Sequence, residues 1–209
     1  MFNNIINNSI IEYYFVFLYK LNFVVMSAMG IKTTADYLDY EKMMFKASKM
    51  LSDEKSRVIG AYIVVAVNTG LRCGDVLKLT FKDLRKDTLT ITEGKTKKTK
   101  TIAINNKIKD MVNKIGKFND GSPFITQKGT VISIQYLNLM LKKIIKEKGL
   151  NISSHSMRKT FGRRVYFQNN ESEKALMYLM DLFNHSSMSI TKKYLGIRQE
   201  ELNNIYLNL

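Results

Sequence analysis

The fold of this chain is decided by residues 58–75, which read Val-Ile-Gly-Ala-Tyr-Ile-Val-Val-Ala-Val-Asn-Thr-Gly-Leu-Arg-Cys-Gly-Asp. Residues 58–67 are apolar on nearly every side of a helix, a pattern typical of a helix buried at the centre of a domain. Gly70 can adopt the left-handed backbone conformation that ends a helix. Arg72 is therefore expected in a tight, defined turn directly after the central helix.

The remaining body of the chain predicts further helices and one β-hairpin. Residues 88–92 and 99–104 alternate polar and apolar side chains with β-branched residues throughout, and the turn between them holds Gly94 and Lys95. The fold class is therefore expected to be mostly α with a small β-hairpin, an α+β domain. The predicted helices follow short polar residues that can cap them: Thr33 or Thr34 to about Leu51, Ser52 to Gly70, Asn105 or Asn106 to Ile115, Ser133 to Lys148, Ser153 or Ser154 onward, Glu171 to Phe183, and 191–194.

The charge balance points to a polyanionic partner. The chain has 33 Lys and Arg against 18 Asp and Glu, a formal net charge of +15 and a pI near 9.7. Such a surplus is typical of proteins that bind nucleic acid, although it also occurs on surfaces that only keep a protein in solution. The basic residues gather at 95–100 and 142–164, which flank the candidate site described next.

Residues suited to phosphodiester chemistry occur along the chain in the order Arg72, Lys95, His155, Arg158, His185 and Tyr194. His155 and Arg158 are three residues apart, so on a helix they share a face. A guanidinium can clamp phosphate oxygens with its planar fork of donors. A tyrosine hydroxyl can attack phosphorus when a base or nearby positive charge helps to remove its proton. Each piece alone fits a capped helix or a surface ion pair, but together they predict attack of Tyr194 on DNA.

This order resembles that of the tyrosine recombinases, the family of phage integrases, Xer proteins and Cre. Thr69-Gly70-Leu71-Arg72 with Asp75 is similar to the first box of the family. Asn184-His185-Ser186-Ser187, followed by Thr191 and Tyr194, is similar to the last box, although Asn184 stands where a glycine is usual. The resemblance covers about residues 34–205 and implies the tyrosine recombinase catalytic-domain fold.

The resemblance also implies a role for each site residue. Tyr194 would be the nucleophile, Lys95 the general acid for the departing 5′ hydroxyl, and His155 an aid to proton transfer at Tyr194. Arg72, Arg158 and His185 would bind the phosphate. Asp75 would orient Arg72 or His155, with an ordinary helix ion pair as the alternative. Direct DNA contacts are expected from the flanking cations Lys97, Lys98, Lys100, Lys159, Arg163 and Arg164.

The implied activity is site-specific recombination through a 3′-phosphotyrosine intermediate, for DNA integration or recombination of a mobile element. Because the phosphotyrosyl link conserves the bond energy, neither a cofactor nor a metal ion is expected. Cys73 is the one cysteine, so the sequence offers neither a disulfide framework nor a zinc cluster. Two alternatives stay open: a type IB topoisomerase-like enzyme that relaxes DNA, and a non-catalytic DNA-binding regulator.

Two segments are predicted, an N-terminal arm at 1–33 and a catalytic domain with a C-terminal tail at 34–209. The arm is either a start-site artefact, with Met26 or Met29 as the natural start, or an amphipathic helix; its apolar run is too short to span a bilayer. It is also too short for the N-terminal DNA-clamping domain that most family members carry.

The expected partners are double-stranded DNA, further copies of the chain as a dimer or tetramer on DNA, and an accessory protein or partner recombinase. The apolar tail after Tyr194 would pack on its own domain or dock on a neighbouring protomer. A cytoplasmic, DNA-associated protein with no membrane contact is expected.

Overall fold

The structure is a computed structural model that describes residues 34–116 and 118–208, so the predictions about residues 1–33 lie outside the described residues. Its elements are α2 (Tyr40–Ser52), α3 (Arg57–Thr69), α4 (Cys73–Val76), α5 (Phe81–Leu84), β1 (Thr88–Thr92), β2 (Thr99–Ala103), α6 (Asn106–Ile115), α7 (Ile134–Ile145), α8 (Ser154–Gln168), α9 (Glu173–Phe183), α10 (Met188–Leu195) and α11 (Ile197–Leu207). The prediction of a mostly helical domain with one small antiparallel sheet is confirmed.

The central helix is α3, as residues 58–67 predict. It packs against α2, α6, α7 and α8, and every residue from Ile59 to Val67 is buried. Gly70 ends it in the left-handed conformation, with φ 63° and ψ 16°. A Cβ atom at Gly70 would lie 2.3 Å from the Phe161 ring, so glycine is needed here both for its backbone conformation and for its size.

Several helix boundaries differ from the prediction. Asp39, and not Thr33 or Thr34, caps α2 by accepting a hydrogen bond from the backbone of Lys42. Asp53 bonds to Ser56 and closes a turn, so α3 begins at Arg57. Helix α7 ends at Ile145 because Lys146 adopts the left-handed conformation three residues before the expected stop at Gly149. Local capping alternatives of this kind are decided by the path of the chain between packed helices.

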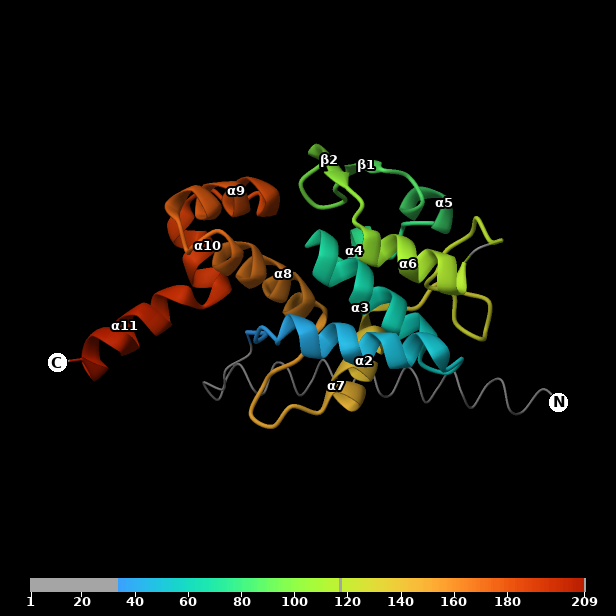
Figure 1. Cartoon of the computed structure of the whole chain (residues 1–209), viewed down its shortest axis with the longest axis horizontal. Coiled ribbons are helices and arrows are strands. Elements are labelled where there is room, and N and C mark those ends of the chain that lie inside the picture. Colours follow the sequence, from blue (N-terminus) through green and yellow to red (C-terminus); the bar gives the residue numbers. More distant parts are fainter. Residues whose placement is uncertain (1–33, 117, 209) are drawn as a thin grey trace.

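The predicted hairpin is present, and its register runs from Thr88 opposite Ala103 to Thr92 opposite Thr99. Leu89 turns into the core, and the threonines of both strands pair on the exposed face, with Thr90 and Thr101 hydroxyls 3.0 Å apart. In Figure 1 the hairpin lies above α3 and α4, on the same side of the molecule as α9.

The core consists of two apolar clusters, and the candidate site lies where they meet. The larger cluster surrounds α3, and the smaller one joins the end of α8 to α9 and α10. Helix α8 passes from one cluster to the other, while α11 extends away from the body toward the C-terminus (Figure 1). Within residues 34–116 and 118–208, no helix is long and apolar enough to cross a membrane.

Candidate active site

The two predicted arginines meet at one backbone oxygen. Arg72 and Arg158 each donate a hydrogen bond from Nη2 to the carbonyl oxygen of Phe183, and both donor–acceptor distances are 3.2 Å. Phe183 is the last residue of α9, where carbonyl groups lack partners within the helix and carry its partial negative charge. The C-terminal end of α9 therefore holds the two cations side by side, although they are far apart in the sequence.

Arg158 is the buried member of this pair, with 4% of its surface exposed. Its Nη1 donates to the carbonyl oxygen of Gly70 at 2.5 Å, and its guanidinium lies 4.3 Å from the centre of the Phe183 ring. Burial lowers the pKa of Arg158 from its ordinary value, and the charge of Arg72 acts in the same direction. Arg158 thus connects the end of α3 to the end of α9, and its guanidinium is buried inside the domain.

Arg72 is held by the hairpin as well as by α9. It stands at the start of the short helix α4, and its Nη1 forms an ion pair with Glu93, the residue that follows β1. Its side chain is 22% exposed, whereas Arg158 is buried. The turn after Gly70 therefore presents Arg72 toward solvent while two acceptors fix its direction.

Glu93 has no exposed surface and accepts four hydrogen bonds. Lys100 Nζ lies 2.6 Å away, Thr96 Oγ1 and Asn184 Nδ2 each lie 2.7 Å away, and Arg72 completes the set. Burial by itself would raise the pKa of Glu93, but the Lys100 and Thr96 hydrogen bonds, the Lys100 charge and Arg72 outweigh it. Together they lower this pKa from 4.5 to about 2, so Glu93 is ionised at neutral pH.

Tyr194 and His185 form an aromatic group with Phe183 beside the arginines. The Tyr194 ring centre lies 5.4 Å from that of Phe183 and 5.2 Å from that of His185, both in edge-on contacts. Among the described residues, the buried Tyr194 hydroxyl has no hydrogen-bond partner. Burial raises the pKa of Tyr194, while the positive charges of Arg158 and Arg72 oppose this increase. The arginines are therefore placed to favour the phenolate form.

His185 is oriented by the helix that carries Tyr194. Its Nδ1 lies 3.1 Å from the hydroxyl oxygen of Thr191, a fully buried residue of α10. Partial burial lowers the pKa of His185, and the charges of Arg158 and Arg72 lower it further, which favours the neutral ring near pH 7. With Thr191 at Nδ1, Nε2 is the ring nitrogen left for another partner.

His155 and Lys95 lie at the rim of this group. His155 is in the first turn of α8 and Lys95 in the hairpin turn, and both have exposed side chains. The shielded part of the His155 ring and the nearby charges of Arg158, Lys159 and Lys95 lower its pKa. His155 is thus suited to accept a proton near neutral pH, and Lys95 is close enough for its charge to lower the His155 pKa.

The structure therefore brings Arg72, Arg158, His185 and Tyr194 together, with His155 and Lys95 at the edge. The hydrogen-bond partner of Asp75 is different from those predicted. It is buried and accepts a hydrogen bond from the backbone N–H of Gly94 at 2.9 Å, so it anchors the hairpin turn and orients neither Arg72 nor His155 by a direct bond.

The predicted DNA-contacting residues divide into two groups. Lys97 and Lys98 are exposed in the hairpin turn, and Lys159 lies with its Nζ 5.3 Å from the centre of the Tyr194 ring.

Lys100 instead points inward to Glu93 and the Leu182 carbonyl oxygen, and is 18% exposed. Arg163 is buried against the rings of Tyr37 and Phe167, and the guanidinium of Arg164 lies over the Tyr40 ring. We therefore assign Arg163 a packing role and leave it out of the DNA-contacting set.

One polar residue of the site, Glu93, was missed in the sequence, and two others, Asn184 and Thr191, were quoted in the last box without a role of their own. Glu93 and Thr191 are fully buried, and the Asn184 side chain reaches Glu93 from the end of α9. The one available signal was Glu93 itself, an acid at the end of a strand in the most basic part of the chain. Among the described residues, no group of three or more His, Cys, Asp or Glu side chains is placed to hold a metal ion.

Comparisons with known proteins show the family to which the chain belongs. The Phage integrase family matches residues 37–201. The probable integrase/recombinase YoeC of Bacillus subtilis is 32% identical over 143 residues, which are 66% of this chain and 76% of that protein. Tyrosine recombinase XerC of Caldanaerobacter subterraneus is 27% identical over 152 residues, 68% of this chain but 42% of that protein.

A solved structure has the same fold. The structure of a lambda integrase dimer bound to a COC′ core site aligns with a TM-score of 0.60 at 17% identity, covering 80% of this chain and 49% of that one. The chain thus spans less than half of two of these three proteins.

Proposed function

The chain belongs to the phage integrase family and is a tyrosine-type site-specific recombinase, and from this premise we propose how its own residues cut and rejoin DNA. Tyr194 Oη attacks the scissile phosphorus, and the bond to the 5′ oxygen breaks. The product is a 3′-phosphotyrosyl link, which a 5′ hydroxyl of a second strand attacks to release Tyr194. Each step exchanges one phosphodiester for another.

The shared acceptor of Arg72 and Arg158 is the observation that carries this proposal. Two guanidinium groups fixed on the Phe183 oxygen, beside the ring of Tyr194, can bind the nonbridging oxygens where negative charge develops during attack. Thr191 also donates to the Ser187 carbonyl oxygen at 3.3 Å, so the Nδ1–H of His185 is the donor toward Thr191, and His185 donates from Nε2 to the same phosphate when the negative charge of that phosphate favours the protonated ring. These groups favour the transition state because its charge exceeds that of the bound substrate.

Proton transfer is assigned to the exposed rim. Tyr194 must lose a proton, and the lowered pKa of His155 keeps that imidazole neutral and able to accept one. Lys95 in the hairpin turn supplies the proton that the departing 5′ oxygen needs. The hairpin is held to Arg72 through Glu93 and to α4 through Asp75, so Lys95 is carried on an anchored loop.

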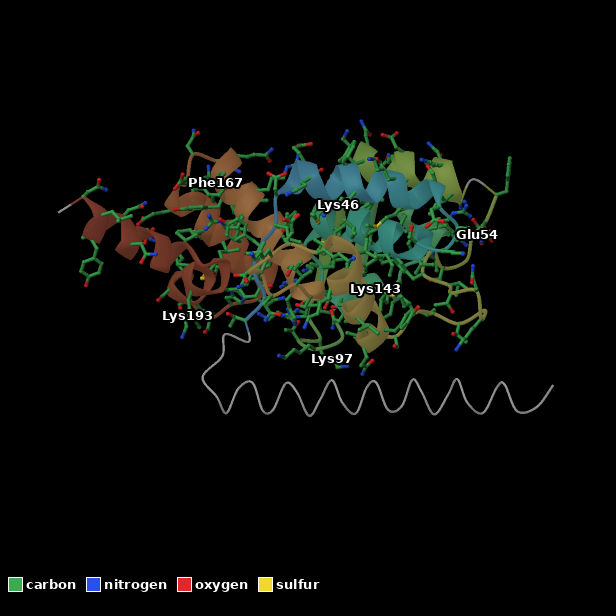
Figure 2. All side chains as sticks on the ribbon, turned by 90° about the horizontal axis from the view of Figure 1, so that it is seen from below. Lys46, Glu54, Lys97, Lys143, Phe167 and Lys193 are labelled. Atoms are coloured by element: carbon green, nitrogen blue, oxygen red, sulfur yellow. The ribbon has the colours of Figure 1, made fainter. Side chains whose placement is uncertain are left out.

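DNA binding and self-association are part of the proposal. Lys97 in the hairpin turn and Lys193 on α10 lie on the same side of the molecule, with Phe167 on the opposite side (Figure 2), and we expect DNA to bind along this basic side. The related lambda integrase is seen as a dimer on its core site. Helix α11 extends from the body and exposes Ile205, Tyr206 and Leu207, which we expect to pack on a neighbouring copy. We propose integration or recombination of a mobile element as the outcome.

A covalent trapping assay tests the proposal. The full chain is incubated in EDTA with nicked duplexes taken from the DNA flanking its gene, and the products are separated on denaturing gels. We expect a protein–DNA adduct that Tyr194→Phe abolishes. Folding should be little changed in this variant because phenylalanine keeps the ring contacts of Tyr194 with Phe183 and His185. Tyr178→Phe, which alters an exposed tyrosine on α9, should form the adduct normally.

The same experiment can contradict the proposal. An adduct that persists in Tyr194→Phe would show that another residue is the nucleophile. Tight, salt-sensitive binding without any adduct, on the flanking DNA and on a randomised duplex library, would show a DNA-binding protein without this chemistry.

A further inference from the structure

We propose that Glu93, working with Asn184, is a positioning residue that sets the direction of Arg72 and locks the hairpin to α9. This inference rests on the proposed recombinase chemistry and adds to it a residue that touches neither DNA nor the nucleophile. It also gives a structural reason for the asparagine that stands at position 184 in place of the usual glycine.

Both carboxylate oxygens of Glu93 accept hydrogen bonds. Its Oε1 accepts from Lys100 Nζ at 2.6 Å, and its Oε2 accepts from Thr96 and Asn184 at 2.7 Å each and from Arg72. Since Glu93 has no exposed surface, each of these bonds operates away from bulk water, where a charged acceptor fixes its donors strongly. A residue used only for solubility or for a surface ion pair would not be enclosed in this way.

Two acceptors leave Arg72 with one direction for its remaining donors. Nη1 is engaged by Glu93 and Nη2 by the Phe183 carbonyl oxygen, so the planar group cannot rotate without losing a bond. The other N–H groups of the fork stay available for a phosphate. Without Glu93, only the bond to Phe183 would hold Arg72, and the guanidinium could turn about that contact.

Asn184 connects this arrangement to α9. It is the C-cap of that helix, in the left-handed conformation with φ 54° and ψ 47°, which asparagine tolerates better than most residues. Its side chain then reaches the hairpin at Glu93, and Lys100 of β2 reaches back to the Leu182 carbonyl oxygen at 3.0 Å. A glycine at position 184 would keep the helix end and lose the bridge.

Charge balance supports the same role. Arg72, Arg158 and Lys100 gather at the end of α9. Burial lowers the pKa of Lys100, and the charges of Arg158 and Arg72 lower it further, whereas Glu93 raises it. Glu93 is thus the counter-charge that allows three cations to share one helix end in the absence of DNA. A phosphate can bind Arg72 without displacing its hydrogen bond to Glu93, because Arg72 has further N–H donors.

Single-turnover cleavage of the nicked duplex, with DNA affinity measured separately, tests this inference. We expect Glu93→Gln to lower the cleavage rate constant by about 10- to 100-fold, the effect of misplacing a catalytic group by about 1 Å, with DNA affinity nearly unchanged. Glu147→Gln is the matched control because Glu147 also accepts from two lysines, Lys42 and Lys46, far from the site; its rate constant should equal that of the wild type.

The form of the kinetic trace separates positioning from loss of folding. Partial unfolding lowers the amplitude of the cleavage phase, whereas misplacement of Arg72 lowers its rate constant at full amplitude. Asn184→Gly should lower the rate constant less than Glu93→Gln, and should have little further effect in the Glu93→Gln background, because both changes break the same bridge. Unchanged rate constants in both single variants, or fully additive effects, would overturn the inference.

Arginine side-chain NMR of the full chain gives a readout that does not depend on cleavage. Arg72, identified by its loss in Arg72→Lys, should give a restrained N–H signal in the wild type that broadens in Glu93→Gln. If the wild type forms no adduct, the proposed chemistry fails, and this signal still decides whether Glu93 holds Arg72. A signal unchanged by Glu93→Gln would overturn the positioning role by itself.

Discussion

Replacing Glu93 by glutamine should destabilise the domain by an amount that depends on pH. The Glu93 pKa is lowered from 4.5 to about 2 by its hydrogen bonds and by Lys100 and Arg72. A tenfold change in proton affinity corresponds to about 1.36 kcal/mol, so the folded state gains about 3 kcal/mol from keeping Glu93 ionised. Removal of one partner from a buried ion pair costs a similar amount, about 3–5 kcal/mol.

The sign of the pH dependence follows from the direction of the shift. Because the folded pKa is depressed, the stabilisation is fully present above pH 4.5 and is lost as the pH falls toward 2. The difference in unfolding free energy between wild type and Glu93→Gln should therefore be about 3 kcal/mol at pH 7, and should shrink to about 1 kcal/mol near pH 2.5.

Urea unfolding of both proteins from pH 7 to pH 2.5, followed by circular dichroism, measures this difference directly. Glu147→Gln serves as the control, since Glu147 lies outside the cores and meets its lysines at the surface. A difference between wild type and Glu93→Gln that stays constant across the pH range would refute the reasoning, because it would show that the Glu93 charge is not what the folded state stabilises.

Two further predictions concern the turn after α3 and the helix that carries Tyr194. Gly129→Ala should lower the free energy of unfolding by about 1 kcal/mol from its positive φ alone, because no atom lies within 4 Å of the new Cβ. Gly70→Ala should lower it by at least about 2 kcal/mol more, measured by thermal or urea unfolding, because its Cβ meets the Phe161 ring. Equal losses at the two glycines would show that the Phe161 contact has no effect. Thr191→Val removes the hydroxyl beside His185 Nδ1, a bond worth about 1 kcal/mol, so the cleavage rate constant should fall about fivefold. An unchanged rate constant would mean that Thr191 does not orient His185.

Much of the fold could be predicted from local patterns. The all-round apolar run at 58–67 specified the buried helix, and alternation specified the hairpin, whereas its register was found in the structure. Helix starts were predicted to within one residue where a short polar residue directly precedes the helical pattern, as at Asn105, Ser133 and Ser153. They were misplaced near residues 33–39, where several residues can cap and the packing of α2 on α3 decides between them.

The sequence by itself determined which residues we propose for the chemistry, because the requirements of phosphodiester attack and the order of Arg72, Arg158 and Tyr194 can be read without a structure. It could not show what holds them. That Arg72 and Arg158 share the Phe183 oxygen, that Asp75 anchors Gly94, and that Lys100 reaches the Leu182 carbonyl oxygen all depend on segments distant in the chain. The physical reason is that burial and charge pairing arise only when α9 and the hairpin close over the end of α3. Tertiary structure alone decided these partners.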